Sequence, residues 1–265
     1  MFIALSEGTY TVGLDKKFVP FDKQKDRIEE RKGTLLVHIQ PFVVYAHHEW
    51  VLIDAGLGFL YGSEYHIHQN LASVGISYKD IQKVLLSHLH FDHANGVVSQ
   101  QGQALFPNAE YFVQAGEYFN AISQNSKSYQ KQHLELLYKT GQLHLLSEKE
   151  GHLSSHIRYE VSGGHTQYHQ VFWIESDNAV YFYGGDVLPS GGQVNRKFVA
   201  KYDYDGKKAM HDRIKYAHQI ATEELIALFY HSDSLEGAKL HAYRDNFEIE
   251  PVYGNTKTNC TKVDS

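Results

Sequence analysis

Four side chains of metal-binding types, His88, His90, Asp92 and His93, fall within six residues of this chain. They follow the segment Lys83–Ser87, whose composition predicts a β-strand. In an extended segment, residues two apart point the same way, so His88 and His90 can bind one cation together. Once the chain turns, Asp92 and His93 face another direction and can reach a second cation. Imidazole and carboxylate ligands favour zinc, with iron, manganese or cobalt as alternatives.

Three more residues of ligand type follow strand-like segments farther along the chain, namely His165, Asp186 and His231. Glycines precede the first two, and glycine permits the tight backbone that brings a side chain close to a buried ion. Taken singly, each of these residues could be a helix cap or a packed histidine. The first cluster could likewise be a histidine-rich surface loop. Together they complete the number of ligands that two four- to five-coordinate ions need if one carboxylate bridges them.

With these residues in this order, the chain resembles the metallo-β-lactamase fold superfamily, whose motif HxHxDH precedes a later His, Asp and His. The resemblance covers Thr34 through His231. It implies that Asp54, in the early Asp-x-Gly element, orients the metal ligands without binding metal itself. It also implies two metal sites, one formed by His88, His90 and His165 and the other by Asp92, His93 and His231, with Asp186 bridging them.

The sequence around these ligands is most similar to the N-acyl homoserine lactonases, the quorum-quenching branch of that superfamily. The segments Ser87–Ala94 and Gly164–Gln170 carry the likeness. The segments Gly185–Ser190 and Lys201–Asp205 also resemble a bacterial branch known only as metal-dependent hydrolases. The resemblance therefore implies a lactonase-like, metal-dependent hydrolase.

Two departures from the related families narrow this expectation. The best-studied lactonases place a tyrosine three residues after the bridging aspartate, whereas this chain has Pro189 there. The β-lactamases with two metals use a cysteine at the position of Asp186, and the only cysteine here is Cys260 in a polar tail. Antibiotic hydrolysis is therefore not expected, and the sequence does not identify the substrate.

The expected reaction is hydrolysis by a metal-activated water. A water shared by two divalent ions loses a proton near neutral pH, and the hydroxide then opens a lactone or cleaves a carboxylic ester. Asp92 would orient this water and accept its proton. Tyr168, His169 and Tyr202 lie close to ligands along the chain and are candidates for substrate contact, although His169 equally suits a hydrogen bond within its own loop.

Two other functions remain open on the sequence. One is another hydrolase of the same fold that acts on a thioester, as glyoxalase II does, or on a phosphoester. Lys201, Lys207 and Lys208 would suit a glutathione or phosphate group, but such charges are also typical of a solvated helix start. The other is a metal-containing binding or redox protein without hydrolytic turnover. His90 argues against the oxygen-reducing diiron members, which usually carry glutamate there.

Composition sets further limits on partners and location. The 25 basic and 31 acidic residues give a net charge of −6 without a basic stripe, which argues against nucleic-acid binding. A single cysteine fits a reducing compartment, and the N-terminus lacks the pattern of a signal peptide. No apolar run is long enough to cross a bilayer. We therefore expect a cytoplasmic enzyme for a small molecule, with a homodimer among the open oligomeric states.

The pattern of strands and helices predicts an α+β protein, a four-layer αβ/βα sandwich with two mixed sheets. We expect one domain over 1–253 and a polar tail over 254–265, while the segment 123–156 supplies no ligand and is a candidate cap over the substrate. Helices are expected over 64–74, 115–122, 127–139 and 207–222. Strands are expected over 34–40, 43–46, 50–54, 83–87 and 110–113, in most of 142–183, and over 225–230.

Overall fold

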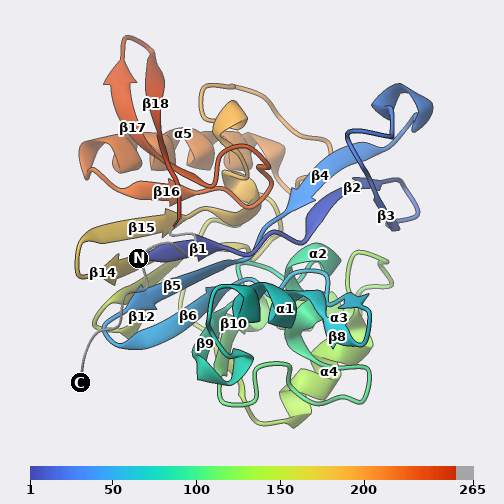
Figure 1. Cartoon of the computed structure of the whole chain (residues 1–265). Helices are drawn as coiled ribbons and strands as arrows, with labels where there is room; N and C mark the ends of the chain where they lie inside the picture. The colour runs from blue at the N-terminus through green and yellow to red at the C-terminus, as the bar shows by residue number, and fades with distance from the viewer. Residues whose placement is uncertain (255–265) are drawn as a thin grey trace.

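The structure is a computed structural model that describes residues 1–254. Two mixed β-sheets pack face to face, and helices cover the outer face of each (Figure 1). This arrangement confirms the predicted four-layer αβ/βα sandwich. The predicted tail, including Cys260, lies outside the described residues apart from Gly254.

The first sheet has six strands in the order β1-β5-β6-β9-β10-β11. Strands β1, β5 and β6 pair antiparallel, and β6, β9, β10 and β11 pair parallel. The parallel strands matter for function, because the segment 88–93, which we call the ligand cluster, begins just after β9. The strands span β1 (Phe2–Ala4), β5 (Phe42–Ala46), β6 (Glu49–Ile53), β9 (Ile81–Leu85), β10 (Glu110–Gln114) and β11 (Leu143–Leu146).

Three helices cover the outer face of the first sheet: α1 (His66–Ser73), α3 (Ala115–Ser123) and α4 (Lys131–Lys139). Each presents an apolar stripe to the sheet. Leu71, Tyr118 and Leu137, one from each helix, are almost completely buried in a cluster that includes Leu52 and Val84 of the strands. Spacing of three or four residues between apolar positions thus produces the packed face that amphipathic helices require.

The second sheet has seven strands in sequence order from β12 to β18. All neighbours pair antiparallel except β15 and β16, which pair parallel across the crossover helix α5 (Gly206–Thr222). Tyr216 and Ile220 of α5 are buried against Trp173 and Phe182 of the sheet. The strands span β12 (Glu150–Ser154), β13 (Ile157–Val161), β14 (Gln170–Ser176), β15 (Ala179–Tyr183), β16 (Ile226–Leu228), β17 (Gly237–Tyr243) and β18 (Asn246–Val252).

The two sheets share a core of large apolar side chains. Phe42 and Ile53 of the first sheet pack with Phe172 and Tyr183 of the second, all at 0% exposure. The rings of Phe42 and Tyr183 meet edge to face, with centroids 6.2 Å apart. Burial of each such side chain contributes about 1.5–3 kcal/mol, so this core keeps the strand ends of both sheets in one relative position.

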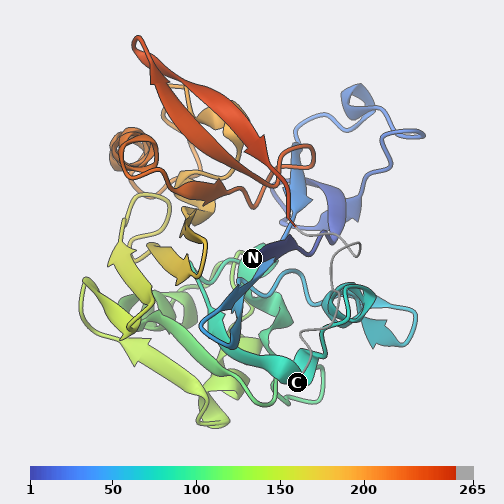
Figure 2. The same cartoon turned by 60° about the vertical axis from the view of Figure 1, so that its left-hand side comes forward.

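A small sheet, which we call the N-terminal arm (residues 8–39), projects from the sandwich (Figures 1 and 2). It pairs β2 (Gly8–Val12) with β3 (Phe18–Pro20) on one side and with β4 (Leu35–Ile39) on the other, and η1 (Ile28–Glu30) lies between β3 and β4. Phe18 stacks on Phe91 of the ligand cluster, with ring centroids 5.7 Å apart. The arm therefore borders the ligand cluster.

Two predicted helices begin later than the sequence indicated. Helix α4 begins at Lys131 instead of Lys127, because the preceding residues pack on the ligand cluster: Phe91 N–H donates to the Ser128 carbonyl over 2.7 Å. Helix α1 begins at His66 instead of Glu64, because β8 (Glu64–Tyr65) pairs with β7 (Leu60–Tyr61). In both places tertiary or hairpin hydrogen bonds replace the first helical turn.

Strands β1 to β3 and the hairpin β17–β18 were not predicted. Both β3 and β18 have few buried residues, so the alternation of apolar and polar side chains is weak there. The remaining short elements are α2 (Phe91–Ala94), η2 (Tyr78–Asp80), η3 (Asn95–Val97), η4 (Gly185–Val187) and η5 (Gly191–Gln193). Within residues 1–254, no helix has the length and apolar character needed to cross a membrane.

Candidate metal centre

The structure brings all seven expected ligands together at one end of the sandwich. His88 and His90 lie in the loop after β9, Asp92 and His93 lie on α2, and the other three follow β13, β15 and β16. Their nitrogen and oxygen atoms form overlapping sets in which every atom lies within 4.8 Å of the others. The sets are His88, His90 and His165; His88, His93 and Asp186; and Asp92, His93 and His231.

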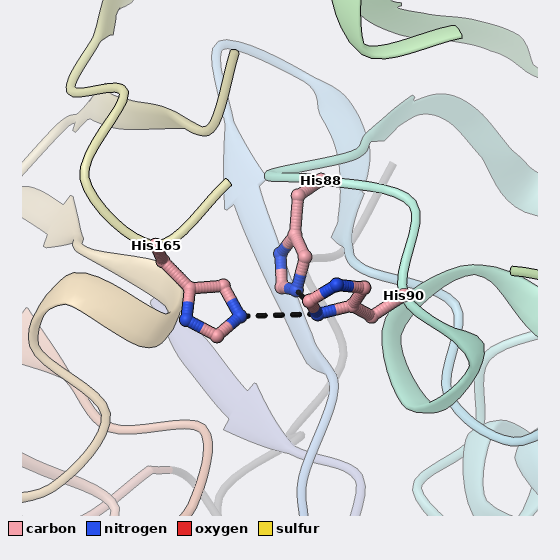
Figure 3. Close-up of side chains that lie close together, drawn as sticks. All are labelled: His88, His90 and His165. Atoms are coloured by element: carbon pink, nitrogen blue, oxygen red, sulfur yellow. Dashed lines mark hydrogen bonds between the residues drawn. The ribbon is translucent and has the colours of Figure 1, made fainter. Parts of the chain in front are cut away.

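The first group consists of three histidines whose ring nitrogens converge (Figure 3). His90 Nδ1 lies 3.0 Å from His88 Nε2 and 3.0 Å from His165 Nε2. Tetrahedral zinc with Zn–N bonds of about 2.0 Å would separate ligand nitrogens by about 3.3 Å. The three nitrogens therefore lie close to the separation that one cation requires.

The hydrogen bonds of His165 and His88 indicate tautomers whose lone pairs face the centre of the group. His165 Nδ1 donates to Asp203 Oδ1 over 2.9 Å, and His88 Nδ1 donates to Ser87 Oγ over 3.0 Å. Their Nε2 atoms then carry no proton when the rings are neutral. Burial, followed by the neighbouring imidazoles, lowers the pKa of His88 and that of His90 well below the usual range. Neutral imidazole is the form that binds metal.

The second group consists of Asp92, His93 and His231. Asp92 Oδ2 lies 3.8 Å from His93 Nε2 and 3.6 Å from His231 Nε2. The carboxylate of Asp186 lies between the two groups. Its Oδ1 is 3.2 Å from His93 Nε2 and 3.1 Å from His231 Nε2, while its Oδ2 is 3.2 Å from His165 Nε2. Each oxygen of Asp186 thus faces a different group, as a bridging carboxylate would.

Asp54 is a fully buried carboxylate behind both groups. Its Oδ2 accepts hydrogen bonds from His93 Nδ1 over 2.8 Å, from Ser87 Oγ over 2.8 Å and from the Tyr183 hydroxyl over 2.5 Å. Through Ser87 it also reaches His88. Carboxylates in this position fix the orientation of metal-binding imidazoles and raise their basicity.

The residues present fit divalent cations. Two buried atoms, His93 Nε2 and Asp186 Oδ1, have no hydrogen-bond partner among residues 1–254. Burial opposes charge on both groups, but the carboxylates of Asp186, Asp92 and Asp54 raise the pKa of His93 well above its usual value. In turn His231, His93 and His165 lower the pKa of Asp186 despite its burial. The arrangement of these side chains therefore favours positive charge at their centre, which metal ions would supply.

His169 is buried beside the candidate ligands and forms hydrogen bonds through both ring nitrogens. Its side chain is 0% exposed, Nδ1 lies 2.7 Å from Ser162 Oγ, and Nε2 accepts the backbone N–H of Asp186 over 3.2 Å. Gly185 has a φ of +48°, and a Cβ there would lie 2.6 Å from His169 Nε2. These contacts fit the second expectation for His169, a hydrogen bond within its own loop, and the ring also holds the backbone of Asp186.

The two candidate tyrosines differ in position. Tyr168 is half-buried and lies against Gly116 of α3. Tyr202 is 49% exposed, with its ring centroid 6.0 Å from that of His165. Burial and the nearby carboxylates of Asp186 and Asp203 raise the pKa of Tyr202 to about 12. Tyr202 therefore borders the candidate metal centre.

Sequence reasoning missed Asp203 and Tyr129. Asp203 lies in the loop before α5, and the available signal was its place in the segment Lys201–Asp205, which resembles the bacterial metal-dependent hydrolases. The ring centroid of Tyr129 lies 5.2 Å from that of His90, at the start of the segment 123–156. Residues near Tyr129 thus border the ligands, whereas α4, β11 and β12 of the same segment belong to the sandwich.

Comparisons with known proteins found one matching family and several similar structures. Residues 37–230 match the family described as the metallo-beta-lactamase superfamily. A probable metal-dependent hydrolase from Staphylococcus aureus superposes with a TM-score of 0.77 at 24% identity, over 97% of this chain and 98% of that one. No curated protein sequence matches the chain.

Two further solved structures share the fold. The dizinc quorum-quenching lactonase AidC, in complex with the product N-hexanoyl-L-homoserine, has a TM-score of 0.73 at 21% identity, over 96% of this chain and 95% of that one. The hydrolase AbOPH of the beta-lactamase superfamily has a TM-score of 0.72 at 21% identity, with the same coverage. At these identities the likeness shows the fold alone.

Proposed function

The chain belongs to the metallo-beta-lactamase superfamily, and from this premise we propose that it opens a lactone or cleaves a carboxylic ester with two divalent cations, preferably zinc. The observation that carries the proposal is the position of Asp186. Its two oxygens face different groups of ligands, at 3.1–3.2 Å from histidine nitrogens on each side. One carboxylate in this position suits a pair of cations better than a single one.

When bound, two divalent cations would lower the pKa of a water between them and polarise a carbonyl oxygen. The protein's own residues would supply orientation and proton transfer. Asp92 is 15% exposed at its side chain, so it can accept a proton from the attacking water. The Tyr230 hydroxyl donates to the Asp92 carbonyl over 2.5 Å and fixes the backbone that carries this carboxylate.

The lactone class is supported by the likeness to AidC, whose structure contains an opened lactone, N-hexanoyl-L-homoserine. Tyr202 is the exposed aromatic side chain beside His165 and would contact the bound substrate. Because Pro189 occupies the position of the lactonase tyrosine, the carbonyl would have to be oriented without a phenol at that position.

The test combines metal analysis with a substrate panel. Protein purified without added metal is analysed for elemental content and then assayed on a lactone, a carboxylic ester, a thioester and a phosphoester. We expect two equivalents of metal and turnover of the lactone or the ester. Asp186→Asn should lower both, whereas the exposed control Asp245→Asn should change neither. Turnover of only the thioester or phosphoester, or one bound iron without any turnover, would contradict the proposal.

A further inference from the structure

Glu117 is a fully buried carboxylate that the proposed chemistry does not use. It lies in the first turn of α3, just after β10. The helix start is anchored to both sheets, because Gln114 Nε2 donates to Gln170 Oε1 over 3.0 Å and Gln170 Nε2 donates to the Leu86 carbonyl over 2.8 Å. The position of Glu117 is therefore well defined relative to the ligand loops.

The two oxygens of Glu117 contact two different ligand loops. The backbone N–H of Leu89 donates to Oε1 over 3.2 Å, and the Thr166 hydroxyl donates to Oε2 over 2.7 Å. Leu89 lies between His88 and His90, and Thr166 directly follows His165. One carboxylate thus connects both chain segments that carry the three-histidine group, although 49 residues separate it from Thr166.

The charge of Glu117 has no counterion in the described structure. Among residues 1–254, no lysine, arginine or histidine forms an ion pair with it. Burial raises the pKa of Glu117, while the hydrogen bonds from Thr166 and Leu89 lower it. A buried carboxylate is costly unless hydrogen bonds or a nearby positive charge compensate it. A cation in the three-histidine group would provide that charge.

We propose that Glu117 is a positioning residue that sets the metal affinity of the group formed by His88, His90 and His165. The inference rests on the proposed function, because it requires metal in that group. Glu117 orients both loops at once, so its loss misplaces His165 relative to the other two rings. The group around Asp92, which Glu117 does not contact, retains its affinity.

Cobalt(II) titration of the metal-free protein tests the proposal, because ligand-field absorption in the visible range reports each occupied site. Glu117→Gln replaces one acceptor oxygen by a donor amide that cannot accept a backbone N–H. We expect one of the two cobalt equivalents to bind about ten- to a hundredfold more weakly, the range typical of outer ligand partners. The second equivalent should bind as in the wild type.

Matched variants separate positioning from a general loss of folding. Thr166→Val removes one hydrogen bond at nearly constant shape and should weaken the same equivalent, whereas Thr166→Ser retains the hydroxyl and should restore wild-type titration. Glu135→Gln on the exposed side of α4 is the control and should change nothing. If Glu117→Gln does not fold, Thr166→Val and Thr166→Ser decide the outcome.

The outcomes also distinguish this proposal from the proposed function. Two wild-type equivalents with unchanged titration in Glu117→Gln or Thr166→Val would overturn the role of Glu117 alone. A wild-type protein that binds no cobalt would overturn the proposed function and this inference with it. Selective weakening of one equivalent supports both.

Discussion

Four candidate ligands point one ring nitrogen at the centre of the site and donate a hydrogen bond from the other: His93, His165, His231 and His88. The acceptors are Asp54 Oδ2, Asp203 Oδ1, the His38 carbonyl and Ser87 Oγ, at 2.8, 2.9, 2.7 and 3.0 Å. These bonds select the tautomer in which a lone pair faces the candidate metal centre. At the scale of single residues, the acceptors therefore determine which histidine nitrogens can bind metal.

Asp54 gives the first prediction at this scale. In the wild type, Oδ2 of Asp54 accepts three hydrogen bonds and Oδ1 accepts the Ser87 N–H. Asp54→Asn retains only one of these two acceptor oxygens. We expect metal retention or activity to fall about ten- to a hundredfold. Elemental analysis and initial rates measure this, with the exposed Asp245→Asn as control. Unchanged metal content and rate would remove Asp54 from the site.

Glu7 gives a prediction about pH. Its side chain is 3% exposed, it accepts the Leu57 N–H over 2.6 Å, and burial raises its pKa from 4.5 to about 7. The folded protein thus binds this proton more tightly than the unfolded chain. The stabilising contribution of the proton is complete below pH 4.5 and is lost as the pH rises through about 7.

Glu7→Gln mimics the protonated carboxyl and should lack this pH dependence. Between about pH 5 and about pH 8, the wild type should lose about 3 kcal/mol of unfolding free energy that Glu7→Gln does not lose. Urea denaturation of the metal-free proteins at both pH values measures the difference. Parallel pH dependence of the two proteins would show that Glu7 titrates normally.

At the scale of elements, the sequence predicted the ligand-bearing strands more reliably than the helix starts. Apart from Gln82, the residues of strands β9, β13, β15 and β16 are buried or half-buried, and most are apolar, so their patterns are strong. The start of α4 and the arm depend on contacts with other segments. Ser128, for example, accepts a hydrogen bond from Phe91 instead of continuing a helix. A local pattern contains no information about such a partner.

Contact between the His165 loop and α5 gives a prediction at this scale. A Cβ on Gly164 would lie 2.6 Å from Ala209 Cα and 2.7 Å from Ala209 N. Gly164→Ala should therefore push α5 away from the loop, at a cost of about 1–3 kcal/mol. We expect a lower melting temperature and weaker cobalt binding, measured by calorimetry and titration.

The matched control for Gly164→Ala is Gly192→Ala. Gly192 is exposed and has only one heavy atom, Ser190 Oγ at 4.0 Å, near its added Cβ. This variant should melt like the wild type. Equal melting temperatures and equal cobalt binding in both variants would show that the loop and helix adjust without strain.

At the scale of the whole molecule, the proposed ligands come from both sheets. The first sheet supplies the loop after β9 and α2, and the second supplies the ends of β13, β15 and β16. Bound metal would therefore connect the two halves across their shared core. A ligand that binds only the folded state, at 100 times its dissociation constant, adds about 2.7 kcal/mol to stability.

Removal of metal should thus lower the melting temperature of the entire molecule in one transition. A chelator titration followed by calorimetry measures this, and addition of zinc should restore the original temperature. Asp186→Asn, which alters the residue shared by both groups, should show a smaller response to the chelator. A melting temperature that does not change with chelator would mean that metal does not connect the halves.

The sequence by itself determined the family, the layered fold and the seven residues that the structure brings together. The motif that carries the family resemblance and the alternating apolar patterns are both local properties of the chain. Only the tertiary structure decided which partner orients each ligand. Asp203 is 38 residues from His165, and Glu117 is 49 residues from Thr166. Such pairs form when two sheets pack on one core, and no local spacing encodes them.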